Sequence, residues 1–263
     1  MPKRSLDKKR IAVTGASSGI GRCVSLRLAA AGAKLVVTAR REELLRSLQK
    51  EIRELNGQCE VVVGDITQSQ THLDVVATCN HAFGGMDCLI NNAGVGAMGP
   101  FAAASMERLR EIFEVNFFSM ASMIRAAVPA LEAGDDALIV NIGSVLGHRA
   151  VPLKSEYCAA KFALHGFSDS LRAELASIPV EVLLVSPSTV DSDFFDSALE
   201  DSTSVNWKKR GSMEPDFVAR KIVSGMQKRN HEIILPLSGR ALVWLDRLFP
   251  TIANRIVSRF GGG

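Results

Sequence analysis

The chain has 263 residues, of which 47% are hydrophobic and 22% are charged. This size and composition are typical of one globular domain with a full core, so we expect residues 1–263 to form a single α/β domain. The formal net charge is +3, which excludes the broad basic field that a nucleic-acid partner requires.

The first nine residues form a basic extension that contains Lys3, Arg4, Lys8 and Lys9. No secretory apolar core follows this extension, and no uncharged apolar run reaches the length of about 18 residues that spans a membrane. We therefore expect a cytoplasmic protein.

Five cysteines are scattered along the chain without a Cys-x-x-Cys pair, at positions 23, 59, 79, 88 and 158. An odd number of isolated cysteines is not the pattern of a disulfide framework, and Cys79 with His81 supplies too few ligands for zinc. The sequence predicts buried thiols in a reducing compartment and no metal site.

Short apolar runs alternate with longer helical patterns. The runs that we expect to form strands are Arg10–Val13, Lys34–Thr38, Glu60–Val63, Cys88–Ile90, Leu138–Asn141, Val180–Val185 and Glu232–Leu235. These runs are continuously apolar, as in parallel strands that are buried on both faces. Helical periodicity is found in Glu42–Leu55, Ser105–Leu131 and Ser155–Ser177. The alternation predicts a doubly wound Rossmann-type fold, with seven mostly parallel strands and helices on both faces of the sheet.

A glycine-rich turn follows the first expected strand and reads Thr-Gly-Ala-Ser-Ser-Gly-Ile-Gly over residues 14–21. Glycines let the chain approach a pyrophosphate closely, and the start of the next helix offers free N–H groups to the anion. The spacing resembles that of the short-chain dehydrogenase/reductase family, in its branch of about 250 residues. The residues that we expect to contact the cofactor here are Gly15, Ser17, Ser18, Gly19, Ile20 and Gly21.

The end of the second expected strand indicates which nicotinamide cofactor is used. Enzymes that bind NAD usually place a carboxylate there for the ribose 2′-hydroxyl, whereas this chain has Ala39 followed by Arg40 and Arg41. Arginine can hold a 2′-phosphate through charge-assisted hydrogen bonds. The sequence favours NADP(H) over NAD(H), with Arg40 on the phosphate and Arg41 and Ser18 assisting. The alternative is that both arginines only face solvent.

The family resemblance assigns further cofactor contacts to the ends of the third and fourth expected strands. Asp65, with Ile66 after it, is expected to hold the adenine amino group. The sequence Asn-Asn-Ala-Gly at 91–94 matches a signature of the family. The resemblance implies that Asn91 braces the sheet and that the adenine ribose is lined by Asn92, Ala93 and Gly94.

The segment after the sixth expected strand departs from the family pattern. Pro187 and Val190 match it, and the resemblance implies that the Val190 backbone N–H meets the nicotinamide carboxamide. Ser188 stands where the family has glycine, and Ser192 stands where it has threonine. If the glycine position needs a positive φ, we expect backbone strain at Ser188.

Tyr157 is the only tyrosine of the chain, and Lys161 follows it by one helical turn, so both side chains share a helix face. A phenol titrates near ~10, and a neighbouring ammonium favours the phenolate. The sequence therefore predicts proton transfer by Tyr157, with its pKa lowered by Lys161. Ser144 and Asn116 match the other catalytic positions of the family. The resemblance implies that Ser144 and Tyr157 contact the substrate oxygen, that Lys161 also holds the nicotinamide ribose, and that Asn116 holds a water linked to Lys161.

Two segments lie outside these motifs. Residues 192–212 are polar and irregular, with embedded aromatic residues, and we expect a substrate loop or lid. Residues 240–260 are amphipathic, and Pro250 is expected to divide them into two helices. Their apolar stripe either packs on the domain or on another subunit, or docks at a membrane surface beside basic residues.

The sequence thus predicts an NADP(H)-dependent oxidoreductase that interconverts a ketone and a secondary alcohol. Pocket walls are expected at Met98, Leu146, Phe194 and Phe195, which favours a lipophilic substrate, acyl or steroid-like. His148 is expected to be a solvated loop residue and His165 a packed helix residue. The alternatives are a catalytically silent nucleotide-binding regulator and a membrane-peripheral scaffold. The resemblance implies a homodimer or homotetramer.

Overall fold

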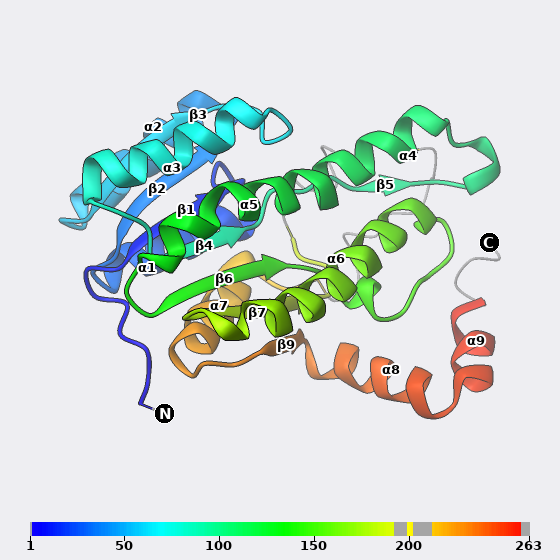
Figure 1. Cartoon of the computed structure of the whole chain (residues 1–263). Helices are drawn as coiled ribbons and strands as arrows, with labels where there is room; N and C mark the ends of the chain where they lie inside the picture. Colours follow the sequence, from blue (N-terminus) through cyan, green and yellow to red (C-terminus); the bar gives the residue numbers. More distant parts are fainter. Residues whose placement is uncertain (1, 192–198, 202–211, 259–263) are drawn as a thin grey trace.

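The computed structural model describes residues 2–191, 199–201 and 212–258, and its main feature is a seven-stranded parallel sheet in the order β3-β2-β1-β4-β6-β7-β9 (Figure 1). The strands are β1 (Arg10–Thr14), β2 (Lys34–Ala39), β3 (Gln58–Val63), β4 (Cys88–Asn91), β6 (Ala137–Ile142), β7 (Val180–Pro187) and β9 (Glu232–Leu235). Every neighbouring pair in this sheet runs parallel. The predicted doubly wound, seven-stranded fold is confirmed.

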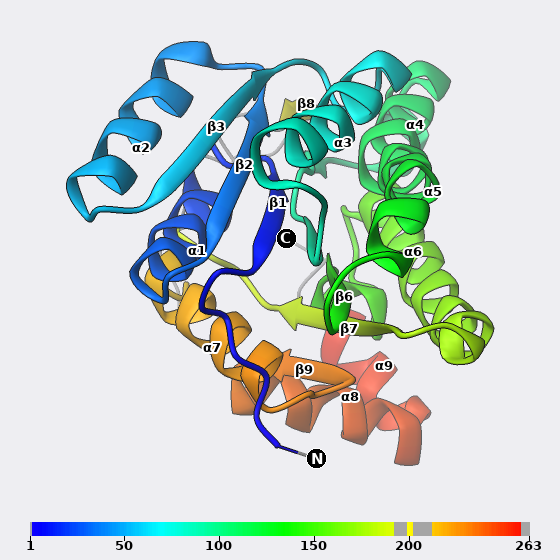
Figure 2. The ribbon, with the colours of Figure 1, turned by 60° about the vertical axis from the view of Figure 1, so that its left-hand side comes forward.

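Helices cover both faces of the sheet (Figure 2). Their bounds are α1 (Gly19–Ala30), α2 (Glu42–Glu54), α3 (Ser69–Phe83), α4 (Met106–Phe113), α5 (Ser119–Glu132), α6 (Ser155–Glu174), α7 (Pro215–Gln227), α8 (Leu237–Leu248) and α9 (Pro250–Ser258). Successive strand residues point to opposite faces. In β1, Ile11 and Val13 therefore join the core under α1, α2 and α7, and Ala12 joins the core under α3, α5 and α6.

The strand order reverses between β1 and β4, and this reversal positions the functional site. In open α/β sheets, ligands bind in the crevice beyond the carboxyl ends of the strands at such a switch point. The loops that follow β1, β4, β6 and β7 carry the glycine-rich turn, the Asn-Asn-Ala-Gly signature, Ser144 and Val190. A second sheet of two short strands, β5 (Ala97–Met98) and β8 (Leu199–Asp201), lies near this edge.

The helix expected over 105–131 is present, and one turn within it departs from α geometry. It consists of α4, a π-helical turn over Glu114–Phe118 and α5. The Ser105 hydroxyl caps α4 by accepting from the Arg108 backbone N–H at 3.1 Å. π turns insert one extra residue into a helix and occur frequently at functional sites. Asn116, which sequence reasoning singled out, lies in the middle of this one.

The tail forms two helices that meet at Pro250, as predicted, and the first of them packs on the domain. A Cβ added at Gly239 would lie 3.0 Å from a Val145 methyl, so α8 approaches the loop after β6 closely. Arg149 in that loop donates to Asp246 at 2.7 Å and to Asn254 at 2.6 Å. Among the described residues, no helix is both long and apolar enough to cross a membrane.

The five cysteines are free, and all except the half-buried Cys23 are buried, which agrees with the prediction of buried thiols. Burial raises the pKa of Cys59, Cys79 and Cys88 to about 12, because a thiolate loses its hydration there. These thiols are inert core groups.

Candidate active site

A cavity of about 700 Å³ opens at the carboxyl edge of the sheet. It brings together 16 residues to which the sequence assigned a site role, and these are Gly15, Ser17, Ser18, Gly19, Ile20, Arg40, Asp65, Ile66, Asn92, Ala93, Gly94, Ser144, Tyr157, Lys161, Pro187 and Val190. Met98 and Leu146 also line it, as expected for pocket walls. Phe194 and Phe195 lie outside the described residues, with the rest of the proposed lid except 199–201 and Ser212. Gly21 and Asn116 are the two predicted residues that do not line the cavity.

The glycine-rich turn is shaped to receive an anion. Gly15 and Gly19 have φ angles of 65° and 53°, a region that glycine adopts without steric cost. The N-terminal turn of α1, which starts at Gly19, opens on the cavity. Gly21 has a structural role instead, because a Cβ there would overlap the Gly15 carbonyl. The cradle fits a dinucleotide pyrophosphate, with backbone N–H groups and a helix N-terminus as its ligands.

The Asn-Asn-Ala-Gly segment is hydrogen-bonded to this cradle. The Asn92 amide donates to the carbonyls of Thr14 and Gly15, both at 3.0 Å. The backbone N–H groups of Asn92 and Ala93 donate to the Thr14 hydroxyl, also at 3.0 Å. Asn91 donates to Asn141 at 3.1 Å and braces β4 against β6. The side chain of Asn92 therefore also has a bracing role, which the sequence assigned to Asn91 alone.

Two arginines edge the cavity at the end of β2, namely Arg40 and Arg41. The Arg41 guanidinium donates to the Ser17 hydroxyl at 3.0 and 3.2 Å and to the Ser18 hydroxyl at 2.6 Å. Arginines with serine hydroxyls beside them form a site of the kind that binds phosphate oxygens. Asp65 also lines the cavity. Its carboxylate accepts hydrogen bonds from the Thr67 backbone N–H and from the Thr67 hydroxyl, both at 2.9 Å.

The residues that the sequence predicts to be catalytic are centred on Tyr157, near the start of α6. Burial raises the pKa of Tyr157, and its hydrogen bond with Ser144 acts in the opposite direction. Ser144 ends the turn after β6, where its hydroxyl accepts from the Leu146 N–H at 3.1 Å. Ser144 and Tyr157 are thus close enough for one substrate oxygen to meet both hydroxyls.

Lys161 is fixed one turn along α6 from Tyr157. Its amine donates to the Ile142 carbonyl at 3.0 Å and lies 5.7 Å from the centroid of the Tyr157 ring. Burial lowers the pKa of Lys161 to about 7. The hydrogen bond with Ser144 lowers the pKa of Tyr157, and the effect that the sequence assigns to Lys161 stays a prediction.

Asn116 is fully buried in the π turn and does not reach the cavity. Its amide donates to the carbonyls of Val95 and Ile112 at 2.9 and 3.0 Å, and its carbonyl accepts from the Val95 N–H at 3.3 Å. Both amide protons are occupied by these contacts. The side chain of Asn116 therefore holds Val95, which lines the cavity, and the water that the family resemblance assigns to Asn116 stays a prediction.

Ser188 is relaxed, in contrast to the expected strain. No positive φ is found at this residue, and its N–H donates to the Leu235 carbonyl at 2.8 Å. Without a positive φ, the position does not need glycine. The following bridge between Val190 and Met213 holds Val190 at the cavity edge.

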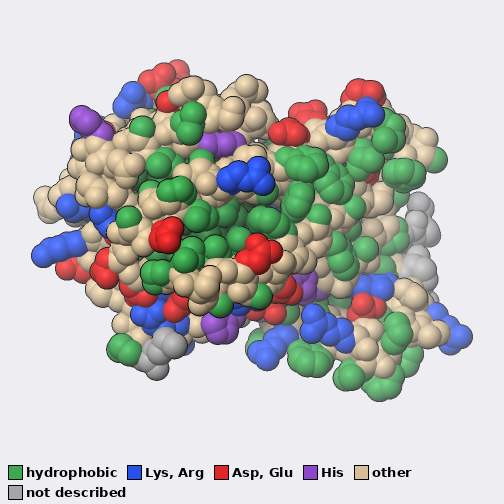
Figure 3. All heavy atoms as spheres, in the orientation of Figure 1, with side chains coloured by type: hydrophobic (Ala, Val, Ile, Leu, Met, Phe, Trp, Pro, Cys, Tyr) green, Lys and Arg blue, Asp and Glu red, His purple; other side chains and the backbone are tan. Residues whose placement is uncertain are grey.

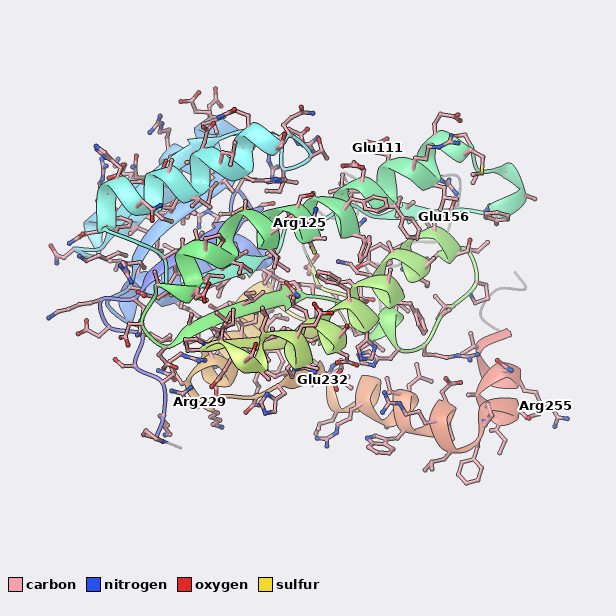
Figure 4. The ribbon with its side chains drawn as sticks, viewed as in Figure 1. Glu111, Arg125, Glu156, Arg229, Glu232 and Arg255 are labelled. Carbon is pink, nitrogen blue, oxygen red and sulfur yellow. The ribbon has the colours of Figure 1, made fainter. Side chains whose placement is uncertain are left out.

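A buried ion pair supports the catalytic helix. Arg108 of α4 donates to the Glu156 carboxylate at 2.6 and 3.2 Å, and both side chains are less than 5% exposed. Burial alone would raise the pKa of Glu156, but the hydrogen bonds from Arg108 lower it on balance. Figure 4 shows Glu156 at the end of α6 that faces α4, one residue before Tyr157.

Other cavity residues had no signal in the sequence. The cavity is also lined by Glu111 and Lys154. Helix α8 contributes three lining residues, Ser238, Gly239 and Leu242. The α8 wall follows from tertiary docking of the tail, which lies beyond the family motifs. His148, expected to be solvated, has a side chain that is 1% exposed, and burial lowers its pKa to about 4.

Comparison with known proteins places these features in context. The sequence pattern of the family described as short chain dehydrogenase matches residues 9–203. An uncharacterized oxidoreductase, YxnA, of Bacillus subtilis is 30% identical over 261 residues, covering 97% of this chain and 73% of the relative. A hydroxysteroid 11-beta-dehydrogenase 1-like protein of Xenopus tropicalis is 32% identical over 260 residues, covering 97% and 88%. The crystal structure of a short chain dehydrogenase/reductase from Burkholderia phymatum in complex with NAD superposes with a TM-score of 0.87 at 25% identity, covering 95% of this chain and 96% of that one.

Proposed function

The chain belongs to the short-chain dehydrogenase family, and from this premise we propose that it is an NADP(H)-dependent enzyme that interconverts a ketone and a secondary alcohol. Membership of the family makes it an oxidoreductase that uses a nicotinamide cofactor. The observation that carries the finer proposal is the convergence of Ser144, Tyr157 and Lys161 on the cavity that the glycine-rich turn also lines.

The proposed reaction divides the chemistry between the cofactor and three side chains. When bound, the nicotinamide supplies or accepts the hydride. Burial keeps Tyr157 protonated near neutral pH, so we write the reaction in the reducing direction, with the Tyr157 hydroxyl giving its proton to the carbonyl oxygen. The Ser144 hydroxyl donates a hydrogen bond to the same oxygen as negative charge develops on it. Lys161 binds the ribose hydroxyls of the cofactor.

NADP(H) is proposed over NAD(H) on the basis of the arginine pair. Arg40 and Arg41 edge the cavity, and residue 39, where enzymes that bind NAD carry a carboxylate, is alanine. The relative from Burkholderia phymatum was solved with NAD, so membership of the family does not by itself select NADP(H). The choice in this chain rests on these residues.

A lipophilic substrate is proposed because a group of apolar side chains lines the cavity that Tyr157 also lines. The side chains that form them are Met98, Val145, Leu146, Val151 and Leu242. Aliphatic and thioether walls bind a substrate through its apolar area, whereas the hydroxyls of Ser144 and Tyr157 orient it. An acyl or steroid-like ketone fits this description.

A panel of ketones tests the proposal. We expect purified protein to oxidise NADPH, followed by its absorbance, with at least one lipophilic ketone and more efficiently than with short-chain ketones. The competing function, a catalytically silent regulator, predicts that NADPH binds without any turnover. Binding without turnover across the whole panel would therefore overturn the proposal.

We also propose peripheral contact with an anionic membrane through α8 and α9. Figure 3 shows hydrophobic and Lys/Arg side chains gathered over these helices. Leu237 and Leu248 are 82% and 63% exposed on α8, and the exposed Trp244 lies between them. Asp246, the only acidic residue of α8 and α9, is paired with Arg149. Exposed apolar side chains beside arginines, with no free carboxylate between them, fit an anionic lipid surface.

Co-sedimentation with vesicles tests this contact. We expect binding to vesicles that contain phosphatidylserine, weaker binding at high salt, and loss of binding in the double variant Trp244→Ser/Leu248→Ser. Leu73→Ser removes an equally exposed leucine from α3 and is the matched control. Equal sedimentation of the double variant and the wild type would refute the contact. A homodimer or homotetramer stays a prediction from the family resemblance.

A further inference from the structure

Three side chains outside the cavity converge beside the catalytic helix. His148 follows the short turn Val145–Gly147, His165 lies on α6, and Glu232 is the first residue of β9. Each offers one ligand atom, and the three atoms lie within 4.8 Å of one another. Figure 4 shows Glu232 on the side of α6 that faces β9. None of the three residues lines the proposed active-site cavity.

The two spacings from Glu232 to the histidines are close to those of ligands around a tetrahedral metal. One Glu232 carboxylate oxygen lies 3.3 Å from His148 Nε2 and 3.9 Å from His165 Nε2. Zinc binds imidazole nitrogen and carboxylate oxygen at about 2.1 Å, which places tetrahedral ligands about 3.4 Å apart. The distance from Glu232 to His148 already agrees with this geometry. A movement of about 0.5 Å by the exposed Glu232 side chain brings the distance to His165 to the same value.

The orientation of His165 is set by its other ring nitrogen. His165 Nδ1 lies 3.2 Å from the Gly147 carbonyl, and a carbonyl can only accept, so the proton is on Nδ1. Histidines that bind metals are oriented in this way by an acceptor on the second nitrogen. The Nε2 lone pair of His165 then faces Glu232 and also Asp169, whose carboxylate lies 3.4 Å away. Repulsion between this lone pair and the two carboxylates is relieved by a positive charge between them, which a bound metal ion or a proton on Nε2 can supply.

We propose that His148, His165 and Glu232 bind one divalent transition-metal ion of the zinc class, with Asp169 or water as the fourth ligand. Metal binding would replace the present contact of His148 Nε2 with the Ser186 hydroxyl at 2.9 Å. It would also leave the buried His148 Nδ1, which has no partner among the described residues, to carry the ring proton. This unsatisfied donor weakens binding, so we expect micromolar rather than nanomolar affinity.

The consequence of such a site is mechanical. The ion would join the loop that follows Ser144 to the helix that carries Tyr157 and Lys161, and both to the start of β9. The relative positions of the catalytic hydroxyls would then be held by a coordinated ion in addition to packing. The proposal concerns binding and stability, and it stands or falls independently of the reaction.

Titration of the full-length, EDTA-stripped protein with zinc chloride in a calorimeter tests the site. We expect one ion per chain, with binding weakened at least tenfold in His165→Asn and in Glu232→Gln. His81→Asn removes an exposed histidine on α3 and is the control, which should bind as the wild type does.

A thermal melt gives a second readout. Zinc should raise the Tm of the wild type and of His81→Asn but not that of the two ligand variants, because only a native-state ligand site stabilises in this way. Glu232 is exposed, so Glu232→Gln is expected to fold even if His165→Asn does not. Absence of stoichiometric binding in the wild type, or unchanged affinity in Glu232→Gln, would overturn the proposal.

Discussion

Replacing Arg41 by alanine tests the assignment of NADP(H) most directly. Its guanidinium donates to the hydroxyls of Ser17 and Ser18 in the glycine-rich turn. Arg41 and Arg40 both line the cavity. A hydrogen bond to a charged group contributes about 1.5–3 kcal/mol. Arg41 is exposed, so solvent screening places its contribution near the lower end, about 1.5 kcal/mol, which corresponds to about tenfold in binding.

The assay compares kcat/KM for NADPH and NADH with one ketone. We expect Arg41→Ala and Arg40→Ala each to lower the value for NADPH about tenfold, and the double variant to lower it about a hundredfold if the two act independently. The value for NADH should change less than about threefold, because it has no 2′-phosphate to lose. Arg46→Ala is the control, since Arg46 lies on α2, which begins directly after Arg41, donates to Glu42 and does not line the cavity.

Two results would refute this reasoning. A wild-type enzyme that uses NADH more efficiently than NADPH would show that the arginines do not select a phosphate. An equal loss with both cofactors in Arg41→Ala would show that Arg41 acts by holding Ser17 and Ser18 in the cradle. In that case the arginine would be a positioning residue for the pyrophosphate turn and not a specificity residue.

Three further predictions follow from the site. Tyr157→Phe should lower turnover by about 10²–10⁴-fold while NADPH binding, measured by fluorescence, is retained; near-normal turnover would contradict the role of Tyr157. Glu156→Gln removes the buried carboxylate that Arg108 binds and should cost about 3–5 kcal/mol in the free energy of unfolding, measured in urea; a loss below about 1 kcal/mol would mean that water reaches the pair. Burial lowers the pKa of Lys161 from 10.5 to about 7, so between these values the unfolded chain binds the extra proton and the stability of the cofactor-free protein rises with pH. Lys161→Met should abolish this rise between pH 7 and 10, and an unchanged slope would show that Lys161 is hydrated.

The sheet could be predicted closely because its central strands are buried on both faces. β6 is buried along its whole length and reads as one apolar run. The edge strand β3 has both ends exposed, and its start at Gln58 lies two residues before the predicted one. The strands β5 and β8 are two and three residues long, and no periodicity can be recognised over such a length.

The site could be predicted where a local motif determines the backbone, as in the turn that begins at Gly15 and in the pair Tyr157 and Lys161. It could not be predicted where tertiary contacts decide. The contact of the Asn116 amide with the Val95 carbonyl, which the π turn allows, is one such case. Ser188 replaces glycine without strain, because the backbone there never needed a positive φ. The wall formed by Leu242 depends on how α8 docks, which no local pattern encodes.

The π turn over Glu114–Phe118 also changes the direction in which the side chains of α4 face relative to those of α5. α4 contacts α6 through Arg108 and through Ile112, which packs in one cluster with Ala160, whereas α5 packs on the sheet through Met123. A regular helix turns 100° per residue, so one uninterrupted helix would present only one of these two faces correctly. The extra residue uncouples them, and substitutions in α4 can therefore remodel the pocket wall while the alignment of α5 on the sheet stays constant. Deleting one residue from the turn would restore a straight helix and rotate one of the two surfaces out of contact.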